Sequence, residues 1–276
     1  ENDTLYVEPT GDPTRLHPYF KDSTAVKFLK GYEKIALNFN SFHEDRFGPG
    51  WAWEDYQYYF SPERSAFPLY GNVVTVFKPN AYDISPRYFK DSIAFKDKKP
   101  SRNLFANSFR VSPTLTDTLE IPFLTSPRLT KALLQQKLKA KISIKGEYPD
   151  GKKETLYGIN TDSIYRRMLY KSDNFLAEQL MLTTASMISD TLKFSIARDY
   201  MFKNQLSDLR QPPRWVDGSG LSRYNLFTPE SMVHVLSKLW NTVPHDRLLH
   251  LFPTWNDEGT IPKEKEAITD SFIHAK

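Results

Sequence analysis

The sequence predicts an α+β protein in which a first half of strands and loops is followed by a second half of helices. Short runs of β-branched and aromatic residues, punctuated by Gly and Pro, occupy residues 1–110. From about Thr161 onward, apolar residues recur at helical spacing. With 39% hydrophobic residues over a length of 276, the chain has enough apolar side chains to bury a core.

The first half opens with a strand-like run at Thr4–Val7, and a second run covers Val73–Phe77. Gly-Asp-Pro at 11–13 and Gly-Pro-Gly at 48–50 are typical of turns and loops between such runs. These segments therefore predict short strands joined by irregular connections.

An aromatic patch at residues 44–62 includes Trp51 and Trp53. We interpret it as a packed corner of the core or a compact loop, in preference to a ligand platform. Residues 80–120 are polar and broken by proline, and they show no sustained period.

The middle of the chain predicts a helix at 129–138, a strand at 141–145 and a turn at 149–151. The pattern changes to helical periodicity after about residue 155. We therefore expect two regions: a β-rich one at 1–157 and a helix-rich one at 158–276.

Helical faces follow one another in the second half. Ile164, Met168 and Leu169 share one face, and further amphipathic runs cover about 175–183 and 190–205. Thr228-Pro229-Glu230 has the features of a helix start: a cap residue, proline in the first turn and then a carboxylate.

Composition excludes several classes of protein. No uninterrupted apolar run exceeds three residues, so the sequence holds no transmembrane helix and no intact signal peptide. The net charge of +4 is mild and its basic clusters are local, which argues against nucleic acid as a partner. The chain has no cysteine, no His-Glu-x-x-His pattern and no Gly-rich phosphate loop, so we expect neither a metal nor a cofactor.

The segment most informative about chemistry is Ser172-Asp173-Asn174, which separates two helical runs. Placed there, the polar triplet would project from a helix–helix corner. Taken alone it is equally well explained by capping, with Ser172 or Asp173 satisfying the first N–H groups of the next helix.

A second segment, Trp215–Asn225, holds Asp-Gly-Ser-Gly-Leu-Ser-Arg at 217–223. Together the two segments resemble the low-molecular-mass penicillin-binding proteins of the D-alanyl-D-alanine carboxypeptidase/endopeptidase type, the S13 serine peptidases. Weaker similarities lie at Gly11–Thr14, Gly50–Trp53 and Glu258–Thr260.

The resemblance implies a serine-type D-Ala-D-Ala carboxypeptidase/endopeptidase that acts on peptidoglycan stem peptides and is acylated by β-lactams. It implies a penicillin-recognising domain of helices packed on an antiparallel sheet, with residues 1–157 as an inserted accessory region. It also implies a periplasmic or otherwise extracytoplasmic location.

The resemblance further assigns roles to individual residues. Ser172 would relay a proton toward the leaving D-alanine amine, and Asn174 would offer its amide to the peptide carbonyl of the substrate. Lys276 would set a positive potential near the substrate's carboxylate. Asp173, Ser219 and Ser222 are candidate substrate-binding residues, although the glycines at 218 and 220 and the turn-capping Asp217 favour an architectural role for that loop.

Departures from the family pattern are also clear. These enzymes use Ser-x-x-Lys, Ser-x-Asn and Lys-Thr-Gly, and the chain contains neither the first nor the third. Since Phe272–Lys276 is similar to the strand that leads into Lys-Thr-Gly, we expect a fragment that is inactive alone.

Rival hypotheses remain open from the sequence. The main alternative is a non-catalytic cell-wall-binding or scaffold homologue that has lost the nucleophile. A nucleic-acid-binding protein and a soluble β-lactamase are weaker alternatives.

Overall fold

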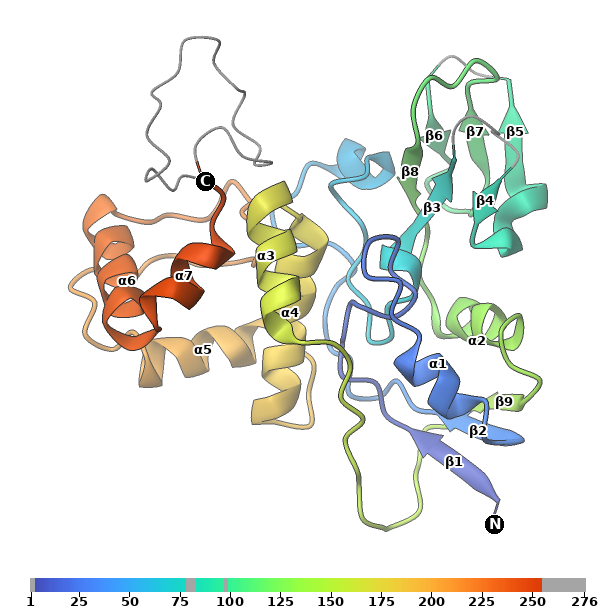
Figure 1. Ribbon diagram of the computed structural model, residues 1–276, viewed down its shortest axis with the longest axis horizontal. Coiled ribbons are helices and arrows are strands. Elements are labelled where there is room, and N and C mark those ends of the chain that lie inside the picture. The colour runs from blue at the N-terminus through green and yellow to red at the C-terminus, as the bar shows by residue number, and fades with distance from the viewer. Residues whose placement is uncertain (1–2, 78–82, 97–98, 255–276) are drawn as a thin grey trace.

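The computed structural model describes residues 3–77, 83–96 and 99–254. Its strands all lie before residue 145, and five of its seven α-helices follow residue 160. Figure 1 shows the helical part on one side and the β-rich part on the other, with α4 (Asn174–Ile188) between them. The predicted α+β class is therefore confirmed.

A parallel sheet is built from β1 (Thr4–Val7), β2 (Lys34–Leu37) and β9 (Lys141–Ile144), in the order β1-β2-β9. The register pairs Leu5 with Ile35 and Ile35 with Ile142. Parallel strands need crossover connections, and helices α1 (Thr24–Leu29) and α2 (Pro127–Gln135) lie within them. Two predicted strands, 4–7 and 141–145, are confirmed here.

Helix α2 begins at Pro127, two residues before the start of the helix predicted at 129–138, and its first turn shows why. The Ser126 hydroxyl accepts a hydrogen bond from the Leu129 N–H at 3.1 Å, and proline follows at the first helical position. Cap chemistry therefore fixes the boundary, whereas apolar periodicity registers only the buried face.

Two further sheets lie together beyond this one. The first is antiparallel, in the order β4-β3-β8, and the second has the order β5-β7-β6. Their strands are β3 (Val73–Val76), β4 (Ile84–Ser85), β5 (Ile93–Phe95), β6 (Ser101–Arg102), β7 (Phe109–Val111) and β8 (Leu119–Pro122). Short 3-10 helices lie at Trp53–Gln57, Tyr70–Asn72 and Arg87–Ser92.

Two expectations differ from the structure in this region. Residues 80–120 carry five short strands, because elements of two to four residues are too brief to give a periodic signal. The aromatic patch is not uniformly packed: Trp53 is 72% exposed and Tyr59 68%, whereas the Trp51 indole is hydrogen-bonded internally.

The second half contains α3 (Thr161–Lys171), α4, α5 (Phe194–Asn204), α6 (Pro229–Thr242) and α7 (His245–Leu251). The predicted start of α6 is confirmed, since the Thr228 hydroxyl accepts from the Ser231 N–H at 3.1 Å. The described residues from 158 to 254 hold no strand, so they do not form the antiparallel sheet that was expected beneath these helices. The division at 157/158 stays a prediction.

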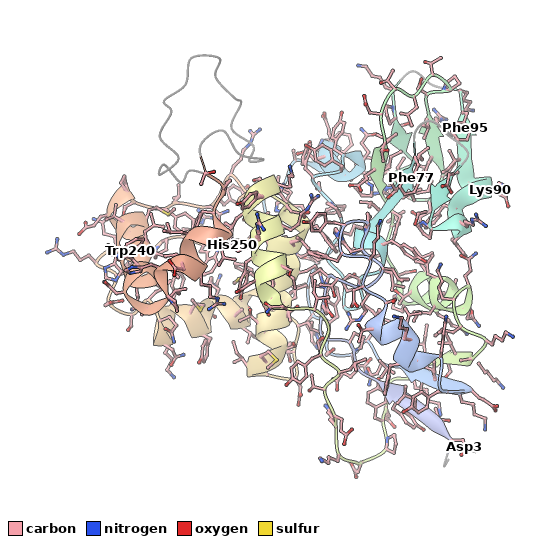
Figure 2. The ribbon with its side chains drawn as sticks, in the orientation of Figure 1. Asp3, Phe77, Lys90, Phe95, Trp240 and His250 are labelled. Atoms are coloured by element: carbon pink, nitrogen blue, oxygen red, sulfur yellow. The ribbon has the colours of Figure 1, made fainter. Side chains whose placement is uncertain are left out.

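Helix α4 joins the helical half to the β-rich half. The Gln179 amide donates to the carbonyl oxygens of Gly11 and Ser65 and accepts from the Ser65 N–H, at 2.7 to 3.0 Å. Figure 2 places Trp240 and His250 on the helical side, and Lys90 and Phe95 on the far β-rich side.

His17 is buried at this junction and stacks on Phe175 of α4 at 6.3 Å between ring centroids. Its Nδ1 accepts a hydrogen bond from the Tyr19 N–H at 3.1 Å. An accepting Nδ1 carries no proton, so the imidazole is held neutral. Burial, with a smaller contribution from the Arg167 charge, lowers the pKa of His17 to about 4.

Candidate active site

The Ser-Asp-Asn triplet forms the corner between α3 and α4. Helix α3 ends at Lys171, and the next residue, Ser172, has φ 51° and ψ 48°, in the left-handed region. Ser172 thus has the left-handed conformation that glycine usually supplies at the end of a helix. The Asp173 N–H donates a hydrogen bond to the Met168 carbonyl oxygen at 3.0 Å and closes that end. The Ser172 side chain is exposed at the tip of the corner.

Asp173 begins the next helix. Its carboxylate accepts from the Leu176 N–H at 3.2 Å, as an N-cap does, and it lies 3.4 Å from Nε of Arg167. Burial raises the pKa of Asp173, and the hydrogen bonds and Arg167 oppose this shift. Its contacts are therefore those of a residue that shapes the corner.

Asn174 stands at the first position of α4, half-buried. Its amide nitrogen donates to the Phe60 carbonyl oxygen at 3.0 Å, so a side chain of the helical part is fixed by the β-rich part. A carboxamide has two N–H donors and an accepting oxygen, so this bond leaves further hydrogen-bonding capacity.

One turn later, Glu178 is buried against Arg64, with Arg64 Nη2 2.6 Å from Glu178 Oε2. Glu178 Oε1 accepts from the Ser219 N–H at 2.7 Å, and Arg64 also contacts Glu44 at 2.9 Å. Burial raises the pKa of Glu178, and Arg64 opposes that shift. Because both oxygens accept from fixed N–H donors, the group is held as a carboxylate.

The loop at 217–222 is organised by Asp217, which is buried. Its Oδ2 accepts from the Trp51 indole N–H at 2.8 Å and from the Ser222 N–H at 2.7 Å. Its Oδ1 accepts from the Gly220 N–H at 2.9 Å and the Asn225 amide at 2.6 Å. Four donors on one carboxylate fix the loop, as expected of the predicted turn cap.

Gly218 brings this loop against the helix. A Cβ at this position would lie 2.6 Å from the Ala177 carbonyl oxygen, so only glycine permits the approach. The loop therefore packs on α4 at Ala177. The two motifs, separated by some forty residues in the sequence, are together in space.

The remaining candidates fall in different places. Ser219 is half-buried, and its hydroxyl accepts from the Leu221 N–H at 3.3 Å. Ser222 is buried, and its hydroxyl donates to the Pro49 carbonyl oxygen at 2.5 Å, so its contacts are those of a structural residue. Lys276 and the Glu258–Thr260 segment lie outside the described residues.

Sequence reasoning missed the groups that hold the two motifs together. Arg64 follows Glu63 in a short polar stretch and carries no motif. Glu178 lies within the segment that drew attention, and its position four residues after Asn174 places it near the same face of α4. Trp51 was expected to be architectural, but nothing in the sequence indicated Asp217 as its partner.

Among residues 3–77, 83–96 and 99–254, no three His, Asp or Glu side chains are gathered as metal ligands. Within the same ranges, no helix has the length and apolar character needed to cross a bilayer.

The mixed α and β architecture is similar to that of solved penicillin-binding proteins. The chain superposes on the crystal structure of penicillin binding protein 4 (dacB) from Haemophilus influenzae with a TM-score of 0.68. Identity is 20%, over 95% of this chain and 67% of that one. The structure of the same protein complexed with a novel β-lactam gives a TM-score of 0.60 at 19% identity, over 95% and 66%.

Residues 124–276, more than half of the sequence, match the D-Ala-D-Ala carboxypeptidase 3 (S13) family. The chain therefore belongs to that family of carboxypeptidases. It spans about two thirds of the length of the solved structures named above. A comparison with curated proteins finds no match.

Proposed function

We propose that this chain supplies the Ser-x-Asn part of a serine-type site that cleaves the D-Ala–D-Ala bond of peptidoglycan stem peptides. The observation that carries the proposal is the corner itself. An exposed serine in the left-handed region is followed two residues later by a fixed asparagine, and the Asp217–Ser222 loop packs on the same helix at Ala177 and Glu178.

The chemistry is acyl transfer. A serine hydroxyl of a Ser-x-x-Lys motif attacks the carbonyl carbon of the penultimate D-alanine, and the bond to the nitrogen of the last D-alanine breaks. Water then releases the acyl group as a carboxylate. These 276 residues contain no Ser-x-x-Lys, so the reaction is proposed for a polypeptide that carries that motif as well.

In this scheme Ser172 passes a proton toward the leaving amine, because its exposed hydroxyl both donates and accepts. Asn174 binds the substrate's peptide carbonyl with its remaining N–H. Lys276 supplies positive charge toward the terminal carboxylate, and Asp173 and Ser219 support the corner and the loop.

Two features support further parts of the proposal. A β-lactam is bound in the structure of the Haemophilus influenzae protein, which supports acylation of the active polypeptide by β-lactams. Peptidoglycan lies outside the cytoplasmic membrane, so we place the protein in the periplasm or another extracytoplasmic compartment.

Labelling with a fluorescent penicillin tests the proposal. In a polypeptide that carries Ser-x-x-Lys together with these residues, Ser172→Ala and Asn174→Ala should each slow acylation by about 100-fold or more. Ser186→Ala, on the same helix but near its other end, should leave the rate unchanged.

Labelling of the isolated 276 residues at one penicillin per chain would overturn this division of roles. Complete absence of labelling in the longer polypeptide would favour the alternative, a non-catalytic cell-wall-binding homologue.

A further inference from the structure

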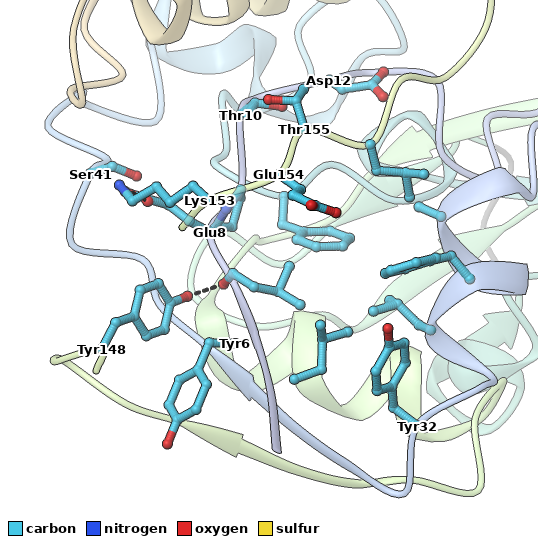
Figure 3. Close-up of a pocket in the computed structure, with 18 of the residues that line it drawn as sticks. Tyr6, Glu8, Thr10, Asp12, Tyr32, Ser41, Tyr148, Lys153, Glu154 and Thr155 are labelled. Carbon is cyan, nitrogen blue, oxygen red and sulfur yellow. Dashed lines mark hydrogen bonds and ion pairs between the residues drawn. The ribbon is translucent and has the colours of Figure 1, made fainter. Parts of the chain in front are cut away.

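A cavity of about 1060 Å³ lies in the β-rich part, away from the Ser172 corner. Its walls are β1 with its continuation to Asp12, helix α1, the segment 148–158 and the far end of α4 (Figure 3). Asn174 and Ile188 are at opposite ends of α4, which makes the separation from the Ser172 corner about 21 Å. The cavity is thus separate from the proposed catalytic centre.

Two buried polar atoms on this wall have no hydrogen-bond partner in the structure, Ser41 Oγ and Arg15 Nε. Both residues line the cavity, and they are only 8% and 9% exposed. The Leu192 N–H binds the Ser41 carbonyl oxygen at 2.7 Å and fixes the backbone there. Buried polar groups are rarely left unpaired, and each costs about 1–3 kcal/mol, so this stretch of the wall is polar and incompletely hydrogen-bonded.

The charge of the lining indicates the sign of that occupant. Eight carboxylates face four lysine or arginine side chains around the cavity, although the chain as a whole carries +4. Glu8 and Asp190 already share one cation: Lys153 Nζ lies 2.7 Å from Glu8 and 3.6 Å from Asp190. Complementarity therefore favours a positively charged occupant.

The shape of the lining indicates an extended chain. Among the strands of the described residues, β1 is at the edge of its sheet and pairs with β2 alone. Every residue from Asp3 to Thr10 borders the cavity, although successive side chains of a strand point to opposite faces. The cavity therefore follows the backbone of an edge strand, which can pair with an added strand.

Aromatic and aliphatic side chains complete the lining. Phe28 and Leu29 of α1 contribute, as do Tyr32, Tyr148 and Phe67. Tyr148 hydrogen-bonds the Val7 carbonyl oxygen, which Figure 3 marks with a dashed line, and so holds the segment 148–158 beside β1. Apolar side chains on alternate positions of a bound strand would find contacts here.

We propose that this cavity binds an extended peptide with positively charged side chains, which pairs with β1 as an added strand. The carboxylates pair with the cations of the peptide, and the peptide backbone bonds the free edge of β1. The inference does not depend on the acyl chemistry proposed above.

The direct test is fluorescence anisotropy of the 276-residue chain with a labelled, acetylated Lys-Val-Lys-Val-Lys amide. We expect saturable binding that weakens as salt is raised. A version N-methylated on alternate amides should bind at least tenfold more weakly, because it cannot complete the strand ladder. Peptide binding should also slow hydrogen exchange of the amides of β1.

Two substitutions in the cavity wall should change the affinity for the peptide in opposite directions. Glu8→Gln should weaken binding about three- to fivefold, whereas Lys153→Ala should strengthen it by removing a competing cation. Asp117→Asn, an exposed carboxylate outside the cavity, is the matched control and should leave binding unchanged. Thermal melts should show that all three variants fold.

Four results would overturn the proposal. The first is equal binding of the two peptides, the second is weakening by both Glu8→Gln and Lys153→Ala, and the third is saturation by a chitin oligosaccharide without peptide binding. Failure of the peptide to bind at millimolar concentration would overturn it too. None of these results bears on penicillin labelling.

Discussion

Replacing Ser172 with glycine should separate stability from activity. Ser172 has φ 51° and ψ 48°, a conformation that costs an L-residue about 1–2 kcal/mol. Glycine relieves that cost but loses about 0.5–1 kcal/mol of backbone entropy. The net gain in the free energy of unfolding is about 0.5–1 kcal/mol, a rise in Tm of about 1–3 °C for a chain of this length.

The assay pairs thermal melts with penicillin labelling of the polypeptide that carries Ser-x-x-Lys. Ser172→Gly should melt higher than the parent, whereas Ser172→Ala, which keeps the strained backbone, should not. Both variants should lose acylation, because both lack the hydroxyl. A lower Tm for the glycine variant, or full acylation by it, would refute the reasoning that the strain is kept for the hydroxyl's sake.

Three other predictions concern buried residues that support the fold around the site. Burial lowers the pKa of His17 to about 4, from 6.5 in the unfolded chain. The stabilisation from neutral His17 is therefore complete above pH 6.5, and the free energy of unfolding falls by about 3 kcal/mol as the pH drops toward 4. In urea titrations at several pH values, His17→Gln should lack this pH dependence. Gly218→Ala should cost about 1–3 kcal/mol in the same assay, while Gly151→Ala, which has open space around it, should be neutral. Glu178→Leu should cost about 3–5 kcal/mol, because the buried Arg64 guanidinium keeps Glu44 but loses its contacts at Nε and Nη2. Arg64→Met in the same chain should restore much of this, and equal losses in the single and double variants would contradict the ion-pair account.

The sequence was sufficient where local chemistry decides structure. Thr228-Pro229-Glu230 predicted the start of α6, because a cap, a proline and a carboxylate each act within one turn. The Ser-Asp-Asn corner was predicted between two helices and lies there, since Asp173 caps the second of them. The family resemblance added the predicted catalytic roles of Ser172 and Asn174 in that corner.

Side-chain contacts between residues far apart in the sequence could not be predicted. Arg64 and Glu178 are 114 residues apart, and Trp51 and Asp217 are 166 apart, so no periodicity or spacing links them. The exposure of Trp53 was missed for a related reason: an aromatic side chain predicts burial on average, but the packing of distant segments decides each case.

The most direct measurement of the central claim is release of D-alanine from a peptide ending in D-Ala-D-Ala, by the polypeptide that carries Ser-x-x-Lys along with this chain. We expect steady release by the parent, a loss of about 100-fold or more in Ser172→Ala and Asn174→Ala, and an unchanged rate in Ser186→Ala. Release at the parental rate by both corner variants would contradict the assignment of this corner as the catalytic centre.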